Sequence, residues 1–162
     1  MIRCLNLSDI HVESEKMGLD HLTRVDHLYI GSKINSSEQV DYLKSLDIKT
    51  VIDLKSCDET TFNDEQVFKE AGLKYFNLPI SNLADLKFDD LKELSDLIND
   101  GQHKTLIYCG SGNRAGAILA LSSCLICGHP KQRAIDFGLK VGIKSSETKD
   151  LIIKILEKGQ LS

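Results

Sequence analysis

Hydrophobic and polar positions alternate along the chain in a way that predicts strands and helices in turn. Short apolar runs rich in β-branched and aromatic residues predict buried strands over His27–Gly31, Thr50–Leu54 and Leu73–Pro79. A fourth run, Thr105–Cys109, has the clearest strand pattern of all. Polar or glycine-containing segments bound each run, so we expect four short strands with other elements between them.

Helical periodicity follows these runs. Val40, Leu43 and Leu46 form an apolar stripe, and Ser36 with Gln39 three residues later fits a capping box. This pattern predicts a helix over residues 37–47. Similar patterns predict further helices over residues 64–71, 88–101, 115–127, 131–140 and 147–157. The helix over 115–127 is apolar almost all round, so we expect it at the centre of the fold.

The order of these elements predicts the fold class. Strands that alternate with helices over short connections run parallel and are joined by helical crossovers. We therefore expect one α/β domain over residues 27–160, with a central, mainly parallel sheet flanked by helices. Residues 1–26 precede the first expected strand. Because residues 1–20 are polar and weakly patterned, we expect an N-terminal arm that is loosely attached.

Length and charge exclude several classes of function. A chain of 162 residues with 41% hydrophobic residues fits one domain with a sizeable core. Its net charge of -4 and its lack of a basic stripe argue against a nucleic-acid partner. No apolar run reaches the roughly 18 residues of a membrane span, and the first ten residues lack the apolar stretch of a signal peptide. We therefore expect a cytoplasmic protein without a membrane partner.

The cysteines and histidines show no regular spacing. Five cysteines are an odd number, which favours reduced thiols, and Cys124 and Cys127 fall in the apolar helix as expected for core thiols. The histidines lack metal-ligand spacing, so we expect no metal site and interpret all five as surface or turn residues. They are His11, His21, His27, His103 and His129.

Two residues, Lys55 and Cys57, follow the second expected strand, and we expect them on the same edge of the sheet as Cys109. Cys57 could form a reversible disulfide with Cys109, although an unpartnered loop cysteine is the favoured interpretation. Lys55 could attract an anion, although a solvated lysine is the default.

The segment from Cys109 to Arg114 concentrates the candidate chemistry. Gly110 and Gly112 let the backbone turn its N–H groups inward, and the following helix adds the positive end of its dipole. Such a loop holds an oxyanion and favours the thiolate form of Cys109. Arg114 supplies a planar pair of donors for two oxygens of the anion. The expected binding residues are Gly110, Ser111, Gly112, Asn113 and Arg114.

On these residues the chain resembles bacterial phosphatase-like proteins with the dual-specificity tyrosine phosphatase fold, including the phosphatase-like domain attached to certain β-lactamase-like hydrolases. The resemblance runs from about His27 to Ile143, and its most specific part is Tyr108–Arg114. It implies that Cys109 attacks phosphorus to form a phosphocysteine, that Arg114 binds the equatorial oxygens and that no metal or other cofactor is needed. It also implies an upstream aspartate as general acid. Asp85, 24 residues before Cys109, is our candidate, ahead of Asp89 and Asp90.

Three features depart from the phosphatase signature. Four residues separate Cys109 from Arg114 where the signature has five, Tyr108 replaces the usual histidine and Ala115 replaces the usual hydroxyl residue. Four is also the spacing of many rhodanese sulfurtransferases, in which the cysteine carries a persulfide. A phosphatase acting on a phosphorylated small molecule or phosphoprotein is our leading interpretation. A sulfurtransferase with a sulfur donor, or a noncatalytic module that binds oxyanions or phosphoproteins, is the alternative.

Overall fold

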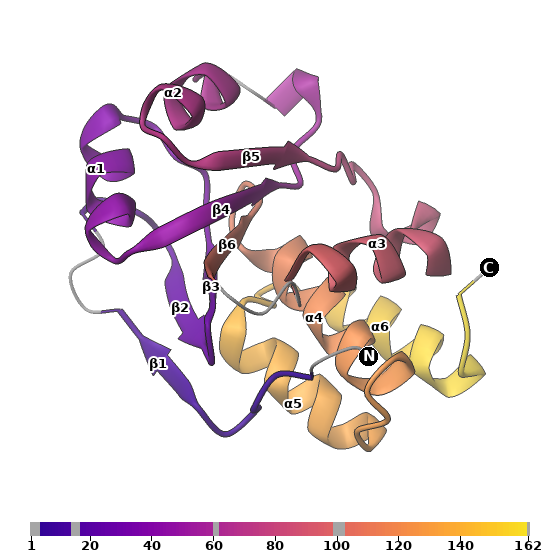
Figure 1. Cartoon of the computed structure of the whole chain (residues 1–162). Helices are drawn as coiled ribbons and strands as arrows, with labels where there is room; N and C mark the ends of the chain where they lie inside the picture. Colours follow the sequence, from indigo (N-terminus) through magenta and orange to yellow (C-terminus); the bar gives the residue numbers. More distant parts are fainter. Residues whose placement is uncertain (1–3, 14–16, 60–61, 99–102, 162) are drawn as a thin grey trace.

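A six-stranded sheet forms the centre of the molecule (Figure 1). The computed structural model describes residues 4–13, 17–59, 62–98 and 103–161. The strands are β1 Ile10–Val12, β2 Leu22–Val25, β3 Leu28–Gly31, β4 Ile48–Asp53, β5 Lys74–Asn77 and β6 Lys104–Tyr108. The helices are α1 Ser37–Ser45, α2 Asp64–Glu70, α3 Phe88–Ile98, α4 Asn113–Leu125, α5 Lys131–Val141 and α6 Ser146–Lys158. Two short 3-10 turns are added, η1 Cys57–Glu59 and η2 Leu83–Asp85.

The strand order is β1-β2-β3-β6-β4-β5. Strands β3, β6, β4 and β5 pair in parallel, which confirms the expected α/β domain and the four strands expected from the sequence. The six expected helices are also present, with ends that differ by a few residues. The expected end of the third helix near Gly101 lies outside the described residues.

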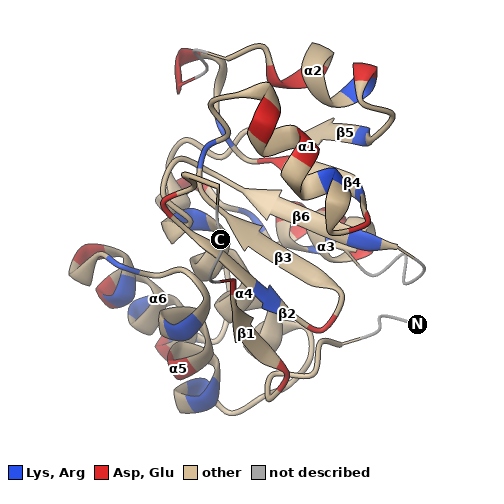
Figure 2. Cartoon of the chain, turned by 90° about the vertical axis from the view of Figure 1, so that its left-hand side faces the viewer, with Lys and Arg blue, Asp and Glu red and all other residues tan. Residues whose placement is uncertain are grey.

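Helices cover both faces of the sheet. Figure 1 shows α1 and α2 on one side and α3 to α6 on the other. Successive residues of a strand point to opposite faces, so Ile107 and Cys109 join the core under α3 to α6, whereas Leu106 and Tyr108 join the core under α1 and α2. The central strand β3 carries no charged residue (Figure 2), as expected for a strand buried on both faces.

The N-terminal region differs from the expected loose arm. Residues 10–12 and 22–25 form β1 and β2, which extend the sheet: β2 pairs antiparallel with β3, and β1 pairs antiparallel with β2. Strand β2 was not predicted because polar and apolar residues do not alternate along it. Leu22, Thr23 and Val25 are all buried. Strand β1 has only three residues and lies at the edge, where Val12 is 67% exposed.

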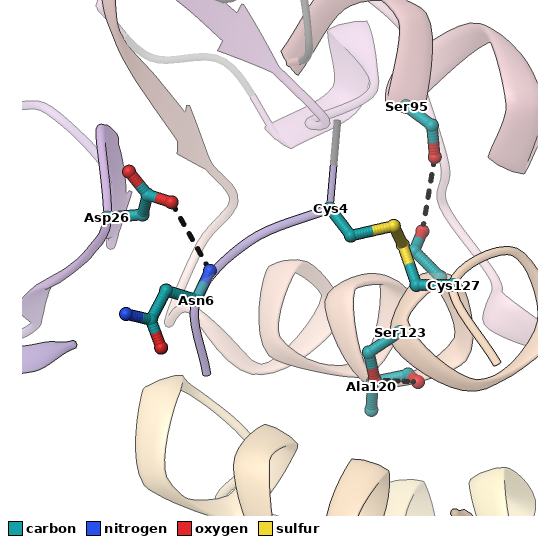
Figure 3. The surroundings of a disulfide bond; sticks show 8 residues. Cys4, Asn6, Asp26, Ser95, Ala120, Ser123 and Cys127 are labelled. Carbon is teal, nitrogen blue, oxygen red and sulfur yellow. Dashed lines mark hydrogen bonds between the residues drawn. A yellow bond between two sulfur atoms is a disulfide. The ribbon is translucent and has the colours of Figure 1, made fainter. Parts of the chain in front are cut away.

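A disulfide joins the N-terminal segment to the turn that follows α4 (Figure 3). Cys4 and Cys127 are bonded across 123 residues of sequence, with their Cα atoms 6.0 Å apart. The expectation that all five cysteines are reduced is therefore wrong, and so is that of Cys127 as a free core thiol. Cys57, Cys109 and Cys124 are free. Because disulfides are rare in cytosolic proteins, this bond does not support the expected cytoplasmic location.

Candidate active site

The parallel strands end together at one edge of the sheet. Gly31 of β3 and Asp53 of β4 both pair with Tyr108, and Asp53 pairs with Asn77 of β5. Cys109 follows Tyr108 directly and is fully buried, and α4 begins four residues later at Asn113. The candidate loop thus lies beyond the carboxyl ends of the strands, where α/β sheets bind their ligands.

Contacts from outside the cysteine loop hold its carbonyl groups. Gly110 O accepts from Lys33 N (3.0 Å), Ser111 O accepts from Lys144 Nζ (3.0 Å) and Gly112 O accepts from Gly116 N (2.9 Å). In a trans peptide the N–H points opposite to the C=O, so the N–H groups of Ser111 and Gly112 point away from these outside contacts, while the Asn113 N–H donates to Ser111 Oγ at 3.3 Å. The Gly112 N–H accordingly donates to Cys109 Sγ at 3.2 Å. The loop therefore presents backbone donors to the sulfur and to an anion beside it.

Glycines outside the loop let the last helices approach it closely. A Cβ atom on Gly142 would lie 2.3 Å from Gly112 O, and one on Gly116 would lie 2.7 Å from Ile143 N. Neither distance leaves room for a side chain. Within the loop, Gly112 has φ of 93°, a left-handed conformation that favours glycine.

Arg114 is held on one edge of its guanidinium group. Nη1 donates to Ile80 O (2.9 Å) and to Glu59 Oε1 (2.8 Å), and Nη2 donates to Glu59 Oε2. The side chain also forms a hydrogen bond with Cys109, and a Cβ on Gly110 would lie 3.5 Å from Nη2. The guanidinium is thus fixed beside the loop with donor capacity left for an anion.

Glu59 is one of the residues of the site that sequence reasoning missed. The hydrogen bond from Arg114 lowers the pKa of Glu59 to about 2, and the same bond raises the pKa of Arg114. Glu59 is therefore ionised at neutral pH and orients the guanidinium from outside. Its position after β4, on the edge where the strands end, is the one signal in the sequence that would have drawn attention to it.

Two further side chains contact the loop. His21, which precedes β2, packs against Gly112, where an added Cβ would lie 2.9 Å from its ring. His21 Nε2 also lies 2.6 Å from Val141 O, so His21 is not the surface or turn residue that we expected. Asn113 Nδ2 donates to Thr148 Oγ1 at 2.6 Å, and Asn113 Oδ1 accepts from the backbone of the α5–α6 connection. The Asn113 side chain thus ties the loop to α6.

A buried polar network lies on the opposite face of the sheet from Cys109. Tyr108 donates from its hydroxyl to Asp64 Oδ2, and Lys55 Nζ donates to the same oxygen at 3.1 Å. Lys55 is only 3% exposed, so its interpretation as a solvated lysine is wrong. Burial raises the pKa of Tyr108, which keeps its hydroxyl protonated as the donor. Tyr108 therefore anchors the strand that carries Cys109, on the face away from the sulfur.

The other candidates lie on the same edge of the sheet. Asp85 is exposed in η2, in the loop that starts at Ile80, the residue whose carbonyl binds Arg114. Cys57 is exposed in η1 with a free thiol, so the structure contains no bond between Cys57 and Cys109. In the described part of the chain, no cluster of three or more His, Cys, Asp or Glu residues is placed to hold a metal. Nor does any helix there have the length and apolar character to cross a membrane.

Solved structures share this fold over most of their length. TpbA of P. aeruginosa has a TM-score of 0.69 at 17% identity, over 88% of this chain and 88% of its own. A DUF442 protein from Shewanella putrefaciens has a TM-score of 0.65 at 19% identity, over 89% and 96% of the two chains. Kinase associated phosphatase, with its catalytic cysteine replaced by serine, has a TM-score of 0.66 at 17% identity, over 92% and 95%.

Sequence comparison gives the family. Comparison with curated protein sequences gave no match. The family model described as "Swiss Army Knife protein, DSP-PTPase phosphatase domain" matches residues 23–152. This range begins in β2 and ends in α6, and it includes the whole cysteine loop. The chain therefore belongs to the DSP-PTPase phosphatase domain family of Swiss Army Knife proteins and is a phosphatase-like hydrolase.

Proposed function

We propose that the protein hydrolyses phosphate monoesters through a phosphocysteine on Cys109. The observation that carries the proposal is the coincidence of nucleophile and anion site. Cys109 Sγ accepts from the Gly112 N–H inside a loop whose carbonyls are held from outside, and Arg114 is fixed beside that loop. A phosphate bound by the same donors would have its phosphorus next to the sulfur, which is the arrangement that covalent catalysis needs.

The reaction has two displacements. In the first, the Cys109 thiolate forms an S–P bond while the P–O bond to the leaving group breaks, and a carboxylic acid protonates the leaving oxygen. In the second, water attacks phosphorus and gives its proton to the same carboxylate. The S–P bond then breaks, which releases inorganic phosphate and restores the thiolate. Arg114 and the loop amides bind the equatorial oxygens in both steps.

We propose Asp85 as the general acid. The loop that carries it contacts Arg114 through Ile80 O, so this loop borders the anion site. Asp85 lies five residues after Ile80, so their separation is at most about 16 Å, and the 3-10 turn η2 shortens it further. Its side chain is exposed and available to a substrate.

A graded series of leaving groups tests this assignment. An alkyl phosphate needs protonation of its leaving oxygen far more than p-nitrophenyl phosphate does. Asp85→Asn should therefore lower kcat for the alkyl ester by about 10²–10⁴-fold and affect the nitrophenyl ester much less. Asp89→Asn, which changes an exposed aspartate at the start of α3, is the matched control. Equal losses on both esters would contradict the role of Asp85.

The substrate is proposed to be a phosphorylated small molecule or a phosphoprotein. A TpbA variant, similar to this chain with a TM-score of 0.62 at 16% identity, was solved in complex with pTyr. This supports an aryl phosphate as the first substrate to test.

A sulfurtransferase is the second candidate, because four residues separate Cys109 from Arg114. Paired assays of p-nitrophenyl phosphate hydrolysis and of sulfur transfer from thiosulfate to cyanide distinguish a sulfurtransferase from a phosphatase. We expect phosphate release that Cys109→Ser lowers by roughly 10³-fold or more. Thiocyanate formation without phosphate release would refute the phosphatase. Absence of both reactions, with thermal protection by phosphate or sulfate, would identify an oxyanion-binding module.

A further inference from the structure

One lysine from outside the cysteine loop binds the loop through its side chain. Lys144 lies in the connection between α5 and α6, and its Nζ donates to Ser111 O at 3.0 Å. Its own backbone N–H donates to Asn113 Oδ1 at 2.9 Å, so both ends of this residue are tied to the loop. Among the described residues, Lys144 forms no ion pair with a carboxylate. Its positive charge is therefore directed at the loop carbonyl.

The bonded carbonyl belongs to the peptide that faces the nucleophile. Ser111 C=O and Gly112 N–H are the two ends of one peptide group, and this N–H donates to Cys109 Sγ at 3.2 Å. A cation on the carbonyl oxygen polarises the peptide and makes its N–H a stronger donor. It also fixes the rotation of the peptide, because turning the N–H away from the sulfur would break the bond to the ammonium group.

We propose that Lys144 is a positioning residue that stabilises the Cys109 thiolate through the Ser111–Gly112 peptide. It acts without touching the sulfur or the substrate. Its role deepens the proposed function and rests on that function only for its effect on turnover, since the protonation state of a thiol can be measured without any substrate.

The other charged groups around the loop act at other points. Arg114 of α4 interacts with Cys109 directly, by a side-chain hydrogen bond, and its charge is also paired with Glu59 of η1. His21, ahead of β2, packs against Gly112 and is held at Val141 O. Lys144 thus supplies a cation that is bonded to the loop backbone and not neutralised by a partner carboxylate in the described structure.

The test is a titration of the thiolate by its ultraviolet absorbance. Each chain is measured against the same chain carrying Cys109→Ser, so that the other free cysteines cancel. Lys144→Met removes both donor and charge, Lys144→Gln keeps a donor without the charge, and Lys144→Arg keeps both. Lys149→Met is the matched control, since Lys149 is an exposed lysine on α6 and its loss changes the net charge equally.

We expect the Met variant to move the titration midpoint upward by about one pH unit, which is about a tenfold lower thiolate fraction on the acidic side. The Gln variant should give a smaller shift, and the Arg variant should match the wild type. Thermal unfolding should be nearly unchanged, because the side chain is exposed. If Lys144→Met titrates like Lys149→Met, the proposal is wrong. If the shift is present but neither the wild type nor any variant hydrolyses p-nitrophenyl phosphate, the proposed function is wrong and the role of Lys144 stands.

Discussion

The disulfide between Cys4 and Cys127 gives the clearest prediction on stability. Replacing both cysteines by serine opens a loop of 123 residues in the unfolded chain. The chain-entropy relation for a loop of this length gives a stabilisation of about 5 kcal/mol at 25 °C. For a protein of this size that corresponds to a fall in Tm of about 10–20 °C.

The local structure sets the lower bound of this effect. Leu7, three residues from Cys4, is 8% exposed and belongs to the core under α3 to α6. Without the disulfide, the segment can detach while the rest stays folded, and the loss is then limited to the free energy of docking that segment. Burial of the Leu7 side chain contributes about 1.5–3 kcal/mol to that docking, so the loss is then of that order.

The assay is thermal unfolding followed by circular dichroism, with and without a reductant. The Tm of the wild type should fall when the reductant is added. The double serine variant should have this lower Tm both with and without the reductant. Cys57→Ser keeps the disulfide and should behave as the wild type. The reasoning is refuted if the reductant leaves the Tm of the wild type unchanged, or if peptides of the unreduced protein show no Cys4–Cys127 link.

Three other predictions follow from single contacts. Gly142→Ala places a Cβ 2.3 Å from Gly112 O, so we expect a loss of roughly 1–3 kcal/mol in the free energy of unfolding, together with a lower kcat. An unchanged midpoint of urea unfolding and an unchanged kcat would contradict this. Tyr108→Phe leaves the buried Asp64 without one donor and should cost about 1–3 kcal/mol in urea unfolding, and a loss near zero would refute the bond. The pKa of Glu59 is lowered from 4.5 to about 2, so its ionised form stabilises the fold above pH 4.5 and this stability is lost as the pH falls toward 2. The difference in Tm between wild type and Glu59→Gln should shrink over that range, and a constant difference would show that the charge has no role.

The sequence predicts those parts of the fold in which local pattern and tertiary structure agree. Ser36 caps α1 through its side chain, as the capping box predicts, and the run that ends at Cys109 forms a central strand. Strand β2 was missed because burial on both faces removes the alternation on which strand prediction depends. The Cys4–Cys127 bond was missed because no local signal links residues 123 positions apart.

The candidate site divides in the same way. Cys109, Arg114 and the glycines between them are contiguous, so their joint chemistry can be recognised from sequence. Glu59 and Lys144 reach the loop from 55 and 33 residues away, through chain reversals that sequence alone does not specify. In the sequence, Lys55 has no feature that distinguishes it from a surface lysine. In the fold its ammonium group pairs with the carboxylate of Asp64 in α2.

The central claim is that Cys109 is the nucleophile of a phosphatase, and direct observation of the covalent intermediate tests it best. The protein is mixed with p-nitrophenyl phosphate, quenched in acid within the first turnovers and digested for mass spectrometry. We predict a phosphoryl group on the peptide that contains Cys109, at a higher level in Asp85→Asn, in which the carboxylate that accepts the proton of the attacking water is missing. Phosphate release that continues without label on this peptide, or that persists in Cys109→Ser, would contradict the account.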